Sequence, residues 1–400
     1  MKYAFILCDG LSDRIPALAE NNTPLTAAKT PCADKLAAAG KCGIAKTTDP
    51  VYPAETLRTD MYIIGCDSKM YPEAPALEAI SCGIPAGEED VVFGCRLISL
   101  SDEEQLEEKS VIDCAPVLSA VQLDVVFSVL DNELSGDVFR FFMSDDKRLY
   151  CVWKRGESDP ASVCSALTAE KNAGKKIGEL LPKGDYSEPV IRMIRKSFEL
   201  LSGLSMNKTR LAAGKPAVNA VWFEELGSVP KTRSFEEKYG LKAAMLTSDR
   251  RLDGLASVME MKRKFSYDES LEELAANAVS ELENGADAAL MHIGSVYTPG
   301  LEMNAEGKIK AIEALDSRLL EPIYKYLSSC GEEHRIILIS SFSCCCSNGI
   351  PSSEPVPFLI YDSRTTHSGS ASFTEQTAFS AGSYIPYGTD IMKLLLLDDN

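Results

Sequence analysis

The sequence predicts an α/β protein with a doubly wound sheet that is interrupted by a smaller α+β domain. First, the chain opens with an apolar run, residues 1–8, which is typical of a buried parallel strand. Second, apolar strands alternate with helical patterns after residue 228. Third, that alternation is absent from residues 93–227. The predicted organisation is therefore a core domain, residues 1–92 and 228–400, with residues 93–227 inserted.

The first predicted strand ends in Asp9-Gly10. Open α/β sheets bind ligands outside the carboxyl ends of their strands, so a carboxylate at this position is well placed to hold a metal. The alternative is a turn aspartate before a glycine, and the run itself does not distinguish the two.

Two Thr-Pro pairs, Thr23-Pro24 and Thr30-Pro31, predict helix starts, since threonine caps a helix and proline suits its first turn. A second strand is predicted over residues 43–48 and a helix over residues 60–65, ending at a glycine. Thr56 then lies on a strand-to-helix turn, where backbone N–H groups favour a phosphate. The alternative is that Thr56 only caps the helix.

The remaining elements follow from periodicity and turn residues. In the inserted segment, helices are predicted over 117–134 and 189–201, and a hairpin over 138–142 and 149–153. In the C-terminal part, strands are predicted over 242–247, 288–292, 335–340 and 356–361, and helices over 271–282 and 309–327.

Composition excludes several classes of protein. The formal net charge of -18 argues against nucleic-acid binding, which needs a cationic face. No apolar stretch approaches the ~18 residues of a membrane span, and the N-terminus has no secretory pattern, so a cytoplasmic location is expected. The 13 cysteines include no Cys-x-x-Cys pair and are predicted to be reduced, packed thiols. The oligomeric state is not predicted.

Imidazole ligands are scarce, and the cysteines show no metal-binding pattern. The chain has only 3 histidines, His292, His334 and His367, and each is expected to be an ordinary, partly buried residue. The run Cys344–Cys346 suggests a thiolate site, but consecutive cysteines point in different directions and no second cluster accompanies them. A cysteine metal site is therefore not predicted.

Several short stretches, in this order and spacing, carry a family resemblance. They are Cys8-Asp9-Gly10, Thr23-Pro24-Leu25 with Thr30-Pro31, Leu77-Glu78-Ala79 with Gly83-Ile84, Leu181-Pro182-Lys183-Gly184, Gly214-Lys215-Pro216-Ala217, residues 234–242, residues 308–313 and residues 355–362. On these, the chain resembles the archaeal-type cofactor-independent phosphoglycerate mutases of the alkaline phosphatase superfamily over nearly its full length. The resemblance implies an alkaline-phosphatase-like core domain and an inserted domain that helps to hold the substrate.

The resemblance also implies a reaction. Such enzymes interconvert 2- and 3-phosphoglycerate through a phosphorylated hydroxyl residue, with two divalent ions (Mn, Mg, Zn or Co) activating that hydroxyl. By position, Asp9 matches a metal ligand, Thr56 the nucleophile that also contacts metal, and Arg148 a substrate-binding arginine. From the residues alone, Arg58, two positions after Thr56, is a candidate for bidentate phosphate binding or a surface residue of the helix.

The matched positions of the other metal ligands carry different residues. These are Tyr297 and Leu301, Ser341 and Phe342, and Pro351. Two ions that share a phosphate each need several oxygen or imidazole ligands, which Asp9 and Thr56 alone do not supply. The prediction is therefore a degenerate relative that has lost two-metal catalysis and retains at most the binding of a small phosphorylated metabolite or a partner.

Two alternatives stay open. One is an active phosphoglycerate mutase, or a related phosphotransferase, whose metal ligands come from other positions such as His367. The other is a structural or interaction protein with no small-molecule site.

Overall fold

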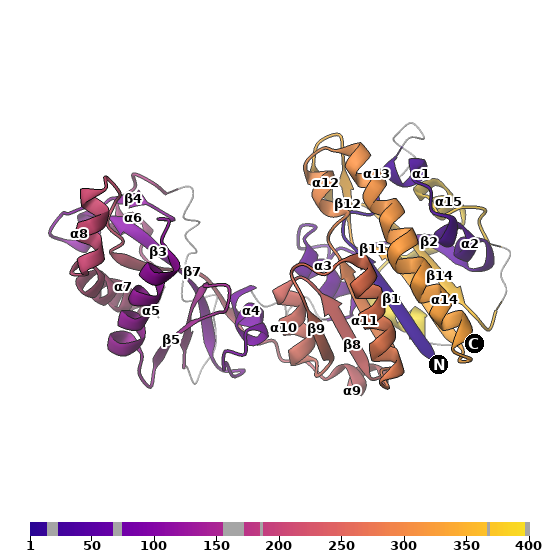
Figure 1. The fold of residues 1–400 in the computed structure, drawn as a ribbon, viewed down its shortest axis with the longest axis horizontal. Helices are drawn as coiled ribbons and strands as arrows, with labels where there is room; N and C mark the ends of the chain where they lie inside the picture. The colour runs from indigo at the N-terminus through magenta and orange to yellow at the C-terminus, as the bar shows by residue number, and fades with distance from the viewer. Residues whose placement is uncertain (14–22, 67–73, 155–171, 185–186, 366–368, 397–400) are drawn as a thin grey trace. The chain divides into compact units, whose positions relative to one another are not determined.

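The computed structural model describes residues 1–13, 23–66, 74–154, 172–184, 187–365 and 369–396. The chain forms two compact units, unit 1 (Met1–Tyr71 and Thr232–Asn400) and unit 2 (Pro72–Lys231) (Figure 1). Residues 72–92, which the sequence analysis assigned to the core domain, lie in unit 2. The physical reason is that helix α4 (Ala74–Ser81) packs against strands β3 (Val91–Leu100) and β7 (Ala220–Ser228) of that unit.

Unit 1 is built on an eight-stranded sheet in the order β15-β2-β14-β11-β1-β10-β8-β9. Its strands are β1 (Lys2–Cys8), β2 (Lys41–Ala45), β8 (Ala243–Thr247), β9 (Lys262–Phe265), β10 (Ala288–Ile293), β11 (His334–Ser340), β14 (Val356–Asp362) and β15 (Tyr384–Ile385). A separate hairpin joins β12 (Ser343–Cys345) to β13 (Ile350–Ser352). The predicted α/β class is confirmed.

Strand β1 lies in the middle of this sheet and decides where the site forms. It pairs in parallel with both β10 and β11, with Leu7 opposite His292 and Cys8 opposite Ser340. The carboxyl ends of the three strands therefore meet at one edge of the sheet. Strand β14 runs antiparallel to both β11 and β2, a pairing that apolar runs alone do not predict.

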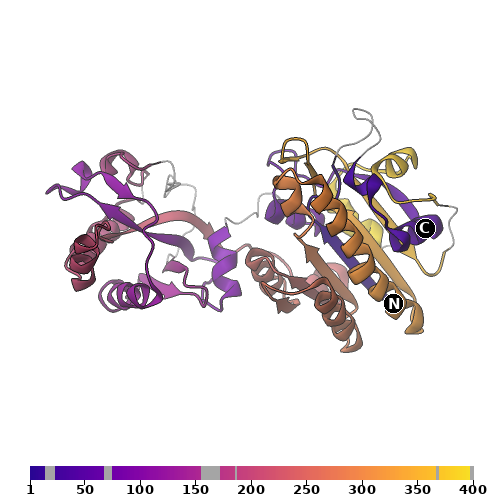
Figure 2. The ribbon, with the colours of Figure 1, turned by 45° about the horizontal axis from the view of Figure 1, so that its top comes forward.

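Helices cover the sheet of unit 1 (Figures 1 and 2). They are α1 (Pro24–Ala27), α2 (Pro31–Ala39), α3 (Thr56–Ile63), α9 (Phe235–Tyr239), α10 (Arg250–Val258), α11 (Leu271–Glu283), α12 (Tyr297–Leu301), α13 (Ala305–Ala314), α14 (Glu321–Ser329), α15 (Glu375–Ser380) and α16 (Ile391–Leu396). A π-helical segment, Leu315–Leu320, joins α13 to α14, so the predicted helix 309–327 is one long element with an irregular middle. In the described part of the chain, no helix is long and apolar enough to cross a membrane.

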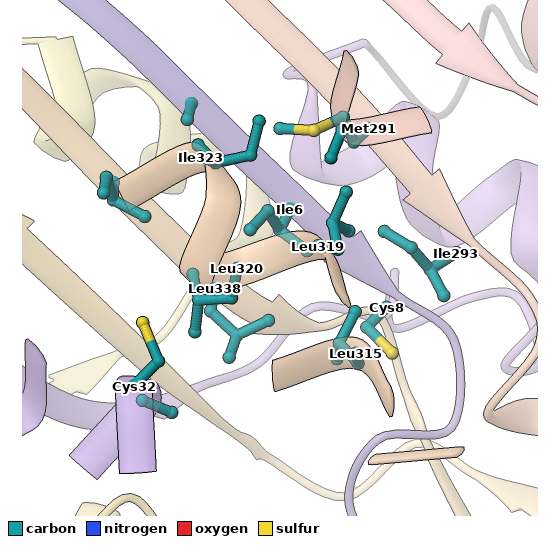
Figure 3. Packing of buried hydrophobic residues seen from close by; sticks show 14 of the residues in the cluster. Ile6, Cys8, Cys32, Met291, Ile293, Leu315, Leu319, Leu320, Ile323 and Leu338 are labelled. Carbon is teal, nitrogen blue, oxygen red and sulfur yellow. The ribbon is translucent and has the colours of Figure 1, made fainter. Parts of the chain in front are cut away.

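The core of unit 1 is formed by side chains of the central strands and the long helix. Figure 3 shows Ile6 and Cys8 of β1 beside Leu315 and Leu319 of the π-helical segment. Each of these side chains is 2% exposed or less. Burying an aliphatic side chain of this size contributes roughly 1.5–3 kcal/mol, so this packing fixes β1 firmly at the centre.

Unit 2 is an antiparallel sheet with helices packed against it. Strands β3, β4 (Val111–Asp113), β5 (Phe139–Met143), β6 (Leu149–Trp153) and β7 form it, with the path β4-β3-β6-β5 and β7 paired to β3. Its helices are α4, α5 (Ala120–Leu134), α6 (Ile177–Leu180), α7 (Ser187–Ser202) and α8 (Ser205–Ala212). The predicted hairpin is confirmed as β5–β6.

Candidate functional site

Three ionisable side chains converge at the carboxyl edge of the unit 1 sheet. Asp9 follows β1, His292 lies near the end of β10, and Asp60 projects from α3. One ligand atom from each lies within 4.8 Å of the other two. The side chains are almost fully buried, at 4% exposure or less. We call Asp9, Asp60 and His292 the acidic-histidine cluster.

Thr56 joins this cluster through its hydroxyl group. It is the first residue of α3, and its Oγ1 donates a hydrogen bond of 2.5 Å to Oδ2 of Asp9. The N-cap of α3 is Glu55, so the alternative that Thr56 only caps the helix is wrong. The helix also begins four residues earlier than the predicted start at Asp60, and Asp60 thus lies one turn after Thr56 on the same face.

His292 is held between the cluster and a neighbouring strand. Its Nε2 lies 3.2 Å from Oδ2 of Asp9 and 3.7 Å from Oδ2 of Asp60. Its Nδ1 lies 3.2 Å from the hydroxyl of Thr247, which in turn accepts a hydrogen bond from the backbone N–H of Asp249. The ring is therefore fixed in orientation, which is how metal-binding or charge-carrying histidines are held.

Burial and charge shift two titrations in the cluster. Burial alone would lower the pKa of His292, but the charges of Asp9 and Asp60 and the contact with Asp9 outweigh it and raise that pKa to about 9. Burial, with the charge of Asp9, raises the pKa of Asp60 to about 8. The carboxyl groups of Asp9 and Asp60 are close together and buried away from water, so a positive charge between them is favourable. The imidazolium of His292 supplies it.

Two carboxylate oxygens of the cluster have no donor. Oδ1 of Asp9 and Oδ2 of Asp60 are buried and accept no hydrogen bond from any described residue. The other oxygen of Asp60 accepts one from the hydroxyl of Ser341, at 2.8 Å. Since buried polar atoms are nearly always satisfied, the orphaned oxygens indicate a missing cation or donor.

The other matched ligand positions are filled differently. The rings of Tyr297 and Phe342 pack edge to face, with centroids 5.0 Å apart, and Phe342 is fully buried. Leu301, the last residue of α12, is 43% exposed, and Pro351 pairs with Cys344 in the β12–β13 hairpin. Phe342, Leu301 and Pro351 offer no side-chain oxygen or imidazole donor. Tyr297 offers only a phenol, and burial raises its pKa, which disfavours the charged form.

Gly10 allows this aromatic pair to come close. Its φ of +64° is a left-handed conformation, and a Cβ at this residue would meet the Cα of Tyr297 at 3.1 Å. Its backbone N–H also donates to the carbonyl oxygen of Phe342, at 3.1 Å. Glycine is therefore required here by both conformation and space.

The donor set fits one divalent ion and not two. Two carboxylates, one imidazole and one hydroxyl surround a single point, and hard or borderline ions accept such ligands. If an ion were bound, these residues would hold it, and it would lower the pKa of the adjacent hydroxyl. Among the described residues, no other group of three or more His, Cys, Asp or Glu side chains lies close enough together to hold an ion.

Arg58 lies near the start of α3, as predicted, but it has partners there. Its Nε is 3.4 Å from a carboxylate oxygen of Glu55, and its guanidinium stacks over Tyr52 at 4.5 Å. Arg251 binds the other oxygen of Glu55 at 2.9 Å. Two guanidinium groups thus converge on one carboxylate directly before Thr56.

Arg148 belongs to unit 2. It follows the turn of the β5–β6 hairpin and its Nη1 lies 2.7 Å from Oε2 of Glu78. It lines a cavity of about 430 Å³ together with Arg96, which pairs with Glu224 at 2.6 Å. Its assignment as a substrate-binding residue stays a prediction.

The other described candidate ligands are not part of the acidic-histidine cluster. His334 is buried in β11, and its Nδ1 lies 3.1 Å from the carbonyl oxygen of Glu332. His367 lies outside the described residues. Burial raises the pKa of the thiols of Cys344 and Cys346, which disfavours the thiolate form that binds metal. All the described cysteines are free thiols, as predicted.

Sequence reasoning missed Asp60 and His292 as members of the site. The i, i+4 spacing from Thr56 could have indicated Asp60, had the helix been started at Thr56. His292 required the knowledge that β10 is the direct neighbour of β1.

Comparison with known proteins agrees with this architecture. The family model of the metalloenzyme superfamily matches residues 1–398, so the chain belongs to that superfamily. Its curated relatives are 2,3-bisphosphoglycerate-independent phosphoglycerate mutases, which confirms the resemblance. One from Methanosarcina barkeri is 29% identical, over 99% of both chains, and a probable one from Geobacter sulfurreducens is 27% identical, over 99% of this chain and 100% of the other.

Two solved structures share the fold. A protein from Pyrococcus horikoshii matches with a TM-score of 0.74 and 22% identity, over 98% of this chain and 96% of that chain. The cofactor-independent phosphoglycerate mutase from Thermoplasma acidophilum matches with a TM-score of 0.70 and 21% identity, over 99% of both. The chain is thus phosphoglycerate mutase-like in both sequence and fold.

Proposed function

We propose that this protein has lost the two-metal phosphoglycerate mutase reaction and binds a small phosphorylated acid at the start of α3 without turnover. The proposal separates the chain from its curated relatives, which are named as mutases. The protein would thus bind a phosphorylated metabolite but would not convert it.

The packed pair of Tyr297 and Phe342 carries this proposal. Two-metal phosphoryl transfer needs two ions about 3.5–4 Å apart to clamp the attacking and leaving oxygens. Here two of the positions where the resemblance implies metal ligands form an edge-to-face aromatic contact between the buried ring of Phe342 and the partly buried ring of Tyr297. An apolar contact cannot neutralise the charge that develops on a transferring phosphoryl group.

The start of α3 supports binding of an anion. Backbone N–H groups and the helix dipole favour a phosphate at a helix N-terminus. Arg58 and Arg251 both lie at this end and both contact Glu55, whose carboxylate occupies the position of an anion between them. A phosphate that displaced Glu55 would gain two guanidinium partners capable of bidentate contact.

The mutase assay is the direct test of lost turnover. Purified full-length protein is incubated with 3-phosphoglycerate and, in turn, Mn²⁺, Co²⁺, Mg²⁺ and Zn²⁺, and 2-phosphoglycerate formation is followed by a coupled enolase assay. We expect no conversion above the level of a Thr56→Ala control. Conversion that Thr56→Ala abolishes would show that the chain is an active mutase with an altered ligand set.

Binding is tested with the arginine variants. We expect Arg58→Gln and Arg251→Gln each to weaken the binding of 3-phosphoglycerate, measured by calorimetry, by about tenfold, since a charge-assisted contact is worth about 1.5–3 kcal/mol. Arg318→Gln, which removes an exposed arginine paired with Glu272, is the matched control and should bind as the wild type does. Equal affinity in all four proteins, or no binding by the wild type, would contradict the proposed anion site.

A further inference from the structure

We propose that Asp9, Asp60 and His292, with the hydroxyl of Thr56, form a binding site for one divalent cation. Asp60 from α3 and His292 from β10 are the ligands that the family resemblance does not assign. This goes beyond the proposed function, which concerns turnover and anion binding.

The spacing of the donor atoms suits a single ion. Ligands bonded to one Zn²⁺ or Mn²⁺ at about 2.0–2.2 Å lie about 3–4 Å from one another. Oδ2 of Asp9 and Nε2 of His292 are 3.2 Å apart, and Oδ2 of Asp60 is 3.7 Å from the same nitrogen. The three side chains come from separate elements that the core fixes, so little rearrangement is needed.

The unsatisfied oxygens are an independent observation. Oδ1 of Asp9 and Oδ2 of Asp60 are buried, and no described residue donates to them. Leaving such an atom without a partner costs about 1–3 kcal/mol, more when the group is charged. A cation satisfies both oxygens together, which a single additional donor from the protein would not do.

The charges and ligand types favour Mn²⁺ or Zn²⁺ over Mg²⁺. Two carboxylates balance a divalent charge, and an imidazole ligand favours the transition metals over the harder alkaline-earth ions. Asp249 adds a further carboxylate nearby, but it is bound by Arg251 at 2.5 Å and is thereby neutralised. Two neighbouring hydroxyl groups orient the ligands: that of Ser341 donates a hydrogen bond to Asp60, and that of Thr247 contacts Nδ1 of His292.

The number of ions follows from the neighbouring side chains. The packed pair of Tyr297 and Phe342 stands at two positions where the family resemblance implies metal ligands. Only one cluster of three potential ligands occurs in the part of the chain that the structure describes. The site therefore takes one equivalent of metal, where the two-metal mechanism of the resembling enzymes would take two.

The experiment is a metal titration of the full chain. Protein stripped with EDTA is titrated with MnCl₂ and, separately, with ZnCl₂ by calorimetry. We expect about one equivalent to bind, and pulsed EPR of the Mn²⁺ complex to show coupling to one histidine nitrogen. Asp60→Asn and His292→Gln should each lower the affinity by roughly 100-fold or more, since even outer-shell partners are worth about 10–100-fold.

Matched controls separate the site from general charge effects. Asp253→Asn removes another buried carboxylate of unit 1, and His334→Gln another buried histidine, and both should bind as the wild type does. If Asp60→Asn fails to fold, Ser341→Ala, which removes only the hydrogen bond to Asp60, should lower the affinity by about tenfold. The nitrogen coupling should disappear in His292→Gln.

Three results would overturn this inference: no binding by the wild type, affinities unchanged in Asp60→Asn and His292→Gln, or two equivalents bound. These outcomes are independent of the mutase assay. If the protein binds no metal, this inference is wrong but the proposed loss of turnover is unaffected. If the protein shows turnover with one bound ion, the proposed function is wrong but the metal site is supported.

Discussion

Replacing Lys308 with methionine is expected to destabilise unit 1 by about 3–5 kcal/mol, the cost of breaking a buried charge network. Lys308 is on α13 and is completely buried. Its ammonium donates to the carbonyl oxygens of Cys344 and Ser12, at 2.7 and 3.2 Å, and lies 3.9 Å from Oδ2 of Asp13. Methionine fills the same space but leaves two buried carbonyl groups and a carboxylate without this partner.

Urea unfolding and thermal melting measure this effect. For a unit of this size, the expected loss lowers the melting temperature by about 10 °C. Lys310→Met is the matched control on the same helix, because its side chain is 71% exposed and its ion pair with Glu306 contributes little. If the free energy of unfolding of Lys308→Met lay within 0.5 kcal/mol of the wild-type value, the buried ammonium would not be important for stability.

The metal-free protein is expected to lose stability as the pH rises from about 4 to 9. The folded pKa values of His292, about 9, and Asp60, about 8, lie above the unfolded values of about 6.5 and 3.9. The folded state therefore binds more protons than the unfolded state. Its stabilisation is complete at low pH and is lost as the pH passes through the folded pKa values.

The size of this effect follows from the shift of His292. At about 1.4 kcal/mol per pKa unit, the shift of His292 alone removes about 3 kcal/mol of stability between its unfolded and folded pKa values, and the shift of Asp60 adds to this loss. The measurement is the free energy of unfolding in urea, in EDTA, at several pH values. The double variant Asp60→Asn with His292→Gln removes both titrations and should lose this component, whereas His334→Gln should keep it. An equal pH dependence in all three proteins would exclude the cluster as its source.

Most of the fold follows from local patterns in the sequence. Apolar runs located β1, β8, β10, β11 and β14, and a turn between alternating runs located the β5–β6 hairpin. Strand β2 begins and ends two to three residues before the predicted range, because alternation marks a strand better than its ends. Local hydrophobic patterns do not indicate which strands a helix packs against. The packing of α4 on β3 and β7 was therefore not predicted, and the predicted domain boundary differs from the one in the structure.

The site is less accessible to sequence reasoning, because its members are far apart in the chain. Asp9 and Thr56 are 47 positions apart, and Asp9 and His292 are 283 apart. Asp9 could be recognised from the sequence because it directly follows the apolar run of a predicted strand. His292 resembles any buried histidine until the strand order places β10 beside β1. Ser341 replaces a metal ligand that the resemblance implies, and in the structure its hydroxyl donates a hydrogen bond to Asp60.

The α/β class, the family resemblance and the residues that replace the expected metal ligands can all be read from local sequence. The meeting of Asp60 and His292 with Asp9 and Thr56, and the packing of Tyr297 on Phe342, depend on the folded chain. The physical reason is that a ligand set is defined by distances of a few ångströms. Such distances are set by strand order, register and core packing, which bring together residues that no local pattern connects.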